Sequence, residues 1–160
     1  MKLAARIAVS LVAVAAVAGC AHSPSTAAIV GDKVISEAEV TEIVDSCRKI
    51  NPQIKRLDVL FPLMFGGSLD EISVKFGKPI DPARLRAVIE ADAVVSQAIG
   101  TPCQKVIEND LKKQYLQSVI GQKALFRELP RAQVNPRYGT WDPERGSNPM
   151  GGSMSVEVES

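Results

Sequence analysis

The chain has 160 residues, with 19 basic and 18 acidic side chains, one His and three Cys. This length suits one ordinary domain. A net charge of +1 excludes a strongly basic nucleic-acid-binding surface, because such modules carry a clear excess of Lys and Arg. Aromatic residues make up 4% of the chain, so we expect a core built mainly from Leu, Ile, Val and Ala.

The N-terminal segment is organised like an export signal. Two basic residues precede an uncharged apolar run, 7–17, which is shorter than the about 20 residues that span a bilayer. The sequence Val17-Ala-Gly-Cys20 then resembles the lipobox of bacterial lipoproteins, in which the Cys thiol is acylated and the chain is cut just before it. An ordinary secretory signal with a chance Cys is the alternative. We expect a lipoprotein signal peptide over 1–19 and a lipid anchor on Cys20.

Residues 20–27 are small or polar and predict a tether on the extracytoplasmic face of the cell membrane. Loss of 1–19 leaves 17 basic and 18 acidic side chains. The acyl chains of Cys20, rather than protein charge, must therefore hold the domain at the membrane.

Two further cysteines, Cys47 and Cys103, would face an oxidising compartment, and they allow one pairing. A disulfide between Cys47 and Cys103 would close a long loop and would stabilise the folded state by about 4 kcal/mol in the chain-entropy model. Two buried free thiols, or a reactive Cys103 near the start of a helix, are the alternatives. We expect the disulfide.

Residues 27–52 predict a hairpin followed by a helix. Two β-favouring pairs flank the turn Gly31-Asp-Lys33, and Ser36 begins the helix with Glu39 at the capping-box position. Asn51-Pro52 ends it. Apolar residues recur at i, i+3, i+4 and i+7, which places Cys47 on the buried face; they are Val40, Ile43, Val44 and Cys47.

Residues 57–100 predict three helices. We expect two short helices, 57–65 and 68–77, joined at Gly66-Gly67. Asp81-Pro82 then provides a cap and a first-turn proline for a helix that runs to Gly100. The apolar face of that helix comprises Leu85, Val88, Ile89, Val95 and Ile99.

The longest helix is expected from Thr101 to about Leu129, a length of roughly 40 Å. Its apolar side comprises Ile107, Leu111, Tyr115, Val119 and Phe126. The segment 131–143 contains two prolines, Pro136 and Pro143, which disfavour a helix. We expect it to be extended, with a turn. Residues 144–160 show no periodicity and predict a disordered tail.

The sequence contains no catalytic set. Its only His, His22, lies in the tether and cannot serve as the base of a Ser-His-Asp or Cys-His site. No His or Cys pair has metal-ligand spacing, and the Gly-Gly pairs lack the phosphate-loop pattern. We therefore expect no enzymatic activity, no cofactor and no metal.

Two segments resemble a known family. Ala28–Val40 (AIVGDKVISEAEV) resembles the strand-turn-helix opening of SurA-type periplasmic chaperones. Val134–Asp142 (VNPRYGTWD) is similar to the closing strand of their actinobacterial lipoprotein relatives. The resemblance implies a mainly α, SurA-N-terminal-like helical domain over 28–143, with a short N-terminal hairpin and a C-terminal extended strand.

In that family such a domain holds unfolded exported chains, and a parvulin prolyl-isomerase domain often follows. The residues after Arg131 are too few for such a domain, so the resemblance implies the binding half alone. The expected partners are unfolded or extended exported polypeptides, in addition to the membrane through the lipid on Cys20.

The apolar run 57–65 is the candidate client-binding surface, lined by Leu60, Phe61, Met64 and Phe65. Alternatively, these four side chains fill the core. The alternative function is that of a structural or accessory envelope lipoprotein with one specific protein partner, for which the segment around Trp141 could be a docking strand. A solute-binding lipoprotein would need two lobes, for which the chain is too short.

Overall fold

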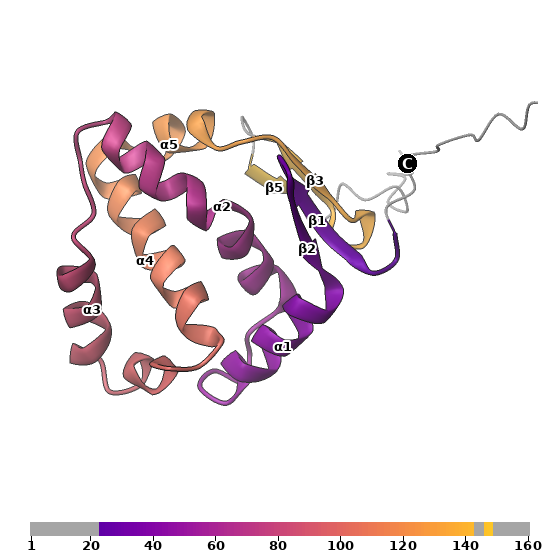
Figure 1. Cartoon of the computed structure of the whole chain (residues 1–160), viewed down its shortest axis with the longest axis horizontal. Coiled ribbons are helices and arrows are strands. Elements are labelled where there is room, and N and C mark those ends of the chain that lie inside the picture. The colour runs from indigo at the N-terminus through magenta and orange to yellow at the C-terminus, as the bar shows by residue number, and fades with distance from the viewer. Residues whose placement is uncertain (1–22, 143–145, 149–160) are drawn as a thin grey trace, which may run out of the picture.

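Helices make up most of the computed structural model, which describes residues 23–142 and 146–148, and a small antiparallel sheet covers one end (Figure 1). The mainly α fold class expected from the sequence is confirmed. The elements are β1 (Thr26–Val30), β2 (Lys33–Ser36), α1 (Glu37–Arg48), α2 (Arg56–Lys75), α3 (Pro82–Ala91), the 3-10 turn η1 (Val95–Ala98), α4 (Cys103–Ile120), α5 (Gln122–Glu128), β3 (Ala132–Val134), the 3-10 turn η2 (Pro136–Tyr138), β4 (Thr140–Asp142) and β5 (Gly146–Asn148). Within the described part of the chain, no helix is long and apolar enough to cross a membrane.

The central strand β1 joins the two ends of the domain. It pairs with β2 through the expected hairpin, whose turn contains Gly31 at a φ of 58°. On its other side it pairs antiparallel with β3, so that Ala28 lies opposite Val134. The ordered domain begins earlier than the sequence predicted, because Ala27 is fully buried in β1 and belongs to the sheet rather than to a tether.

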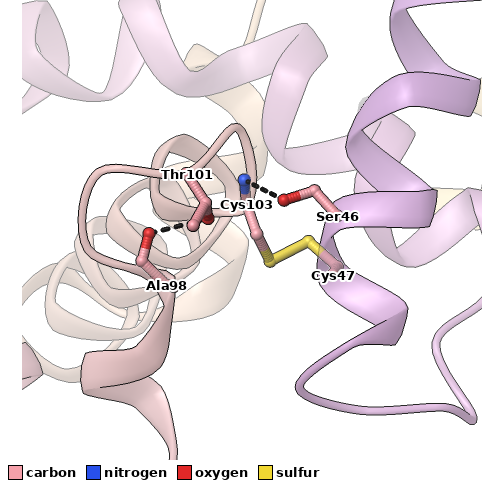
Figure 2. Close-up of a disulfide and its surroundings, with 5 residues drawn as sticks. All are labelled: Ser46, Cys47, Ala98, Thr101 and Cys103. Carbon is pink, nitrogen blue, oxygen red and sulfur yellow. Dashed lines mark hydrogen bonds between the residues drawn. A yellow bond between two sulfur atoms is a disulfide. The ribbon is translucent and has the colours of Figure 1, made fainter.

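Helix α1 begins and ends as predicted. Ser36 caps it, since its Oγ accepts a hydrogen bond from the backbone N–H of Glu39 at 3.0 Å. The predicted apolar stripe is buried as a whole. At its end, Cys47 forms a disulfide with Cys103 at the start of α4, with the two Cα atoms 5.0 Å apart (Figure 2). The predicted bridge is therefore present, and the two free-thiol alternatives do not apply.

Helix α2 corrects the prediction of two short helices joined at Gly66-Gly67. It is one continuous helix, and both glycines lie inside it. Gly66 packs against the buried side chain of Asn109 on α4, whose Nδ2 donates to the carbonyl oxygen of Pro62 at 3.0 Å. A methyl group at Gly66 would overlap Asn109, whereas Gly67 faces open space. The first glycine serves close helix packing rather than a turn.

Helix α3 also differs from its prediction, because it ends at Ala91 and not at Gly100. The Oδ1 of Asp92 accepts hydrogen bonds from the backbone N–H groups of Val94 and Val95, at 2.8 and 2.9 Å. These bonds lower the pKa of Asp92 and begin the 3-10 turn η1. Asp92, expected inside the helix, therefore ends α3 and starts the 3-10 turn.

The long helix expected from Thr101 to Leu129 is two helices. Gly121 separates α4 from α5 with a φ of 85° and a ψ of 148°, a conformation that an L-residue with a side chain rarely adopts. At the start of α4, the hydroxyl of Thr101 donates back to the carbonyl of Ala98 at 2.7 Å instead of capping the helix (Figure 2).

The C-terminal segment is extended, as predicted, with β3 and β4 separated by η2. Strand β4 pairs with β5, so residues 146–148 form a strand where a disordered tail was expected. The rest of that tail, the signal peptide, Cys20 and His22 lie outside the described residues.

Replacement of Gly66 by Ala should lower the free energy of unfolding by about 1–3 kcal/mol, because the added methyl must displace Asn109 from a packed helix contact. The matched control is Gly67→Ala, for which we expect no loss and a gain of up to about 1 kcal/mol from the higher helix propensity of Ala. Urea unfolding followed by circular dichroism measures both. Equal effects of the two substitutions would contradict the packing role of Gly66.

Candidate functional site

The structure favours the core interpretation of the predicted client-binding residues. The side chains of Leu60, Met64 and Phe65 are at most 5% exposed. Phe61 is half-buried and lies edge-on to Phe65, with ring centroids 4.9 Å apart. As folded, these residues of α2 offer no continuous surface to a polypeptide.

Trp141 packs against the same aromatic side chains of α2, Phe61 and Phe65. Its ring lies 4.8 Å from that of Phe61 and 4.7 Å from that of Phe65, and Phe126 of α5 completes the group at 5.9 Å. Such offset and edge-to-face pairs stabilise by about 0.5–1.5 kcal/mol each beyond area burial. Trp141 therefore fastens β4 onto α2 and α5, and its ring is not presented as a docking element.

A polar cluster lies at the start of α1; we call it the Glu37 cluster (Glu37, Arg56, Arg137 and Tyr138). The Oε2 of Glu37 accepts from Arg56 Nη2 and from the Tyr138 hydroxyl, each at 2.7 Å. Arg56 Nε donates to the Tyr138 hydroxyl at 2.8 Å, and Arg137 Nη1 lies 3.6 Å from Glu37 Oε1. The cluster joins the first turns of α1 and α2 to η2.

Electrostatically, the Glu37 cluster sets one carboxylate against two guanidinium groups, Arg56 and Arg137, which leaves one positive charge in excess. The hydrogen bond with Tyr138 raises the pKa of Arg56, and burial raises the pKa of Tyr138. Both groups therefore keep their protons at neutral pH. An open hollow of about 860 Å³ lies beside the cluster, with Glu42 and Asp45 on its wall. The carboxylate of Glu37 is committed to two arginines, so the arrangement suits fastening of the chain rather than proton transfer.

A largely apolar hollow lies between α3 and α4, and we call it the α3–α4 groove. It has a volume of about 350 Å³, at the lower end of the range of ligand pockets. Its apolar lining comprises Pro79, Ile80, Leu85, Val88, Leu111 and Tyr115, and its polar lining comprises Asp81, Arg84, Lys112, Gln114 and Ser118.

The groove exists because both helices carry more apolar surface than the core covers. Helix α3 buries only Ile89 fully, and its Val88 is 50% exposed. Helix α4 turns Val106 and Leu116 to the core, so Tyr115 is left 37% exposed on another side. Exposed apolar side chains on two neighbouring helices, gathered around one hollow, are typical of a binding surface.

Charged side chains of both signs, Asp81, Arg84 and Lys112, line the groove. The Nζ of Lys112 forms an ion pair with Asp70 of α2 at 2.7 Å, so its charge is compensated within the domain. Asp81 caps α3 by accepting from the N–H of Ala83 at 2.9 Å. The groove therefore suits the apolar side chains of a flexible or extended chain more than a charged small molecule.

No group of three or more His, Cys, Asp or Glu residues in the described ranges could hold a metal ion. In comparisons with protein-family models, with curated proteins and with solved structures, the chain matches none of them.

The sequence pattern missed the groove although its residues were identified as apolar. The sequence predicts Leu85 and Val88 on the apolar face of one helix and Leu111 and Tyr115 on the apolar side of the next, without showing which apolar sides the domain covers. The sequence does contain a signal for the groove: α4 has two apolar sides, because Val106 and Leu116 form a second side that faces the core. A helix apolar on two sides has one side free for a partner or for a third helix.

Replacement of Tyr138 by Phe should lower the free energy of unfolding by about 1–3 kcal/mol, because it removes two charge-assisted hydrogen bonds of the hydroxyl, with Glu37 and with Arg56. Tyr115→Phe is the control, since the described residues give its hydroxyl no hydrogen bond, and we expect a change within about 0.5 kcal/mol. Thermal unfolding of both variants measures the difference.

The stabilisation by Tyr138 should also depend on pH. Its pKa is higher in the folded state than the ordinary value of 10.0, so the protonated phenol is favoured by folding. The difference in free energy of unfolding between the unchanged protein and Tyr138→Phe should be complete below pH 10. It should decline as the pH rises through the folded-state pKa of Tyr138. A constant difference across this range would show that the phenol proton is not involved.

Proposed function

We propose that this protein is a membrane-anchored extracytoplasmic lipoprotein that binds unfolded or extended exported polypeptides without catalysing a reaction. The observation that carries the binding part is the α3–α4 groove, with Val88 and Tyr115 exposed on its wall. The lipobox-like sequence ending at Cys20 supports the anchor, and the resemblance of 28–40 and 134–142 to SurA-type chaperones supports the class of client.

The size of the groove limits the affinity that it can provide. A hollow of about 350 Å³ takes a few apolar side chains and not a folded partner. Burial of each such side chain contributes about 1.5–3 kcal/mol, from which the ordering of a flexible client must be subtracted. We expect micromolar dissociation constants, about −8 kcal/mol, and little weakening by salt because apolar burial dominates.

Substitution of both exposed groove residues, Val88→Ser and Tyr115→Ser, should weaken the binding of a labelled unfolded polypeptide at least tenfold, about 1.4 kcal/mol, because apolar area is lost where the client contacts it. The matched control is Val34→Ser with Val74→Ser, which removes two valines that are 58% and 72% exposed outside the groove lining. Fluorescence anisotropy titration measures the three dissociation constants.

Equal binding by a folded groove variant would exclude this groove as the site. Binding of several unrelated unfolded chains supports the chaperone-like function. Capture of one folded envelope protein, with no affinity for unfolded chains, would instead support the accessory lipoprotein.

Replacement of Cys20 by Ser should abolish acylation and release the protein from the membrane fraction, because the thiol is the attachment atom in the lipobox interpretation. The control removes the disulfide instead, as Cys47→Ser with Cys103→Ser, and should keep its lipid. Incorporation of labelled fatty acid measures both. Labelling of the Cys20→Ser chain would show that the anchor is elsewhere.

A further inference from the structure

The start of the described chain is held firmly against the sheet end of the domain. The carbonyl of Ser23 accepts from the N–H of Thr26, and that of Ser25 accepts from the N–H of Glu37, both at 2.8 Å. Arg137 Nη2 donates to the carbonyl of Pro24 at 3.3 Å. The backbone is thus fastened from Ser23 onward, three residues before β1 begins at Thr26.

Only two residues separate Ser23 from Cys20. Whatever conformation they adopt, three residue steps reach at most about 11 Å. A lipid on Cys20 would therefore keep Ser23 within that distance of the Cα atom that carries the lipid. Such a connection is a short strap and not a spacer that lets the domain turn freely.

The α3–α4 groove lies at the other end of the molecule. In Figure 1 the longest axis runs horizontally, with α3 at one end and the start of β1, beside β3, at the opposite end. The chain that follows the signal has 17 basic and 18 acidic side chains, so its net charge does not attract the domain to anionic headgroups.

We infer that the membrane-anchored protein faces the phospholipid headgroups with its sheet end, around Ser23, Pro24 and Arg137, and holds the α3–α4 groove on the side away from the membrane. This inference rests on the proposed function, because it requires the lipid on Cys20. Arg137 suits such a surface, since its side chain is 50% exposed and carries a positive charge beside the strap. Clients of the groove are then polypeptides in the aqueous space, not segments embedded in the bilayer.

Single fluorophores on the acylated chain test this orientation. Ser23→Cys places the label at the sheet end, and Ala87→Cys places it on an exposed position of α3 outside the groove lining. Cys47 and Cys103 are bridged and an acylated Cys20 has no free thiol, so each variant has one reactive Cys. The protein is reconstituted in phosphatidylcholine vesicles that contain a lipid with a nitroxide on its headgroup.

We expect nitroxide quenching several-fold stronger at position 23 than at position 87. Equal quenching, or stronger quenching at position 87, on chains shown by mass spectrometry to be acylated overturns the orientation and leaves the lipid anchor intact. Absence of acyl chains on Cys20 overturns the anchor and the orientation together. The groove titration is measured without membranes, so the outcome for polypeptide binding is independent of both.

A lengthened strap provides the matched control. Insertion of 20 Gly and Ser residues before Ser23 gives a root-mean-square reach of about 25 Å, so quenching at position 23 should fall while that at position 87 stays low. Unchanged quenching at position 23 would show that the domain adheres to the bilayer by its own surface, which contradicts the strap.

Discussion

The close contact between α2 and α4 is the constraint on which the rest of the domain depends. It requires that Gly66 have no side chain, because Asn109 occupies that space and donates to the carbonyl of Pro62. The disulfide then fixes the start of α4 to the end of α1, and the Glu37 cluster fixes the start of α2 to the start of α1. Three helices are thereby held by one covalent and two polar connections around an aliphatic core.

Helix α3 is the element left outside this arrangement, and the groove follows from that position. It contributes one fully buried side chain, Ile89, and otherwise rests beside α4 (Figure 1). A helix that buries so little against its own domain adds little to stability, because helices in proteins are stabilised mainly by packing of their apolar face. Its exposed Val88 therefore contributes little to the stability of the domain.

The parts of the fold that the sequence predicted are those with local signals. The hairpin follows from the turn at Gly31 and α1 from the Ser36 cap and its apolar stripe. The disulfide follows from the two cysteines that are left once Cys20 is set aside as the proposed lipid site. The continuity of α2 was missed because a Gly-Gly pair signals a break unless a distant residue fills the space, and Asn109 lies 43 positions away from Gly66. The groove was missed because periodicity shows which side of a helix is apolar and not which side is covered.

The position of β1 between β2 and β3 has a consequence for the order of folding. A chain made from its N-terminal end produces β1, β2 and α1 early, but the second neighbour of β1 is β3, which includes residues only from 132 onward. Closure of so long a loop is entropically slow, and until then one edge of β1 stays unpaired. Cys103 is complete well before β3, so oxidation of the Cys47–Cys103 pair can shorten that loop in advance. The covalent bond between α1 and α4 thus acts on the kinetics of assembly, by bringing the late strand toward the early one.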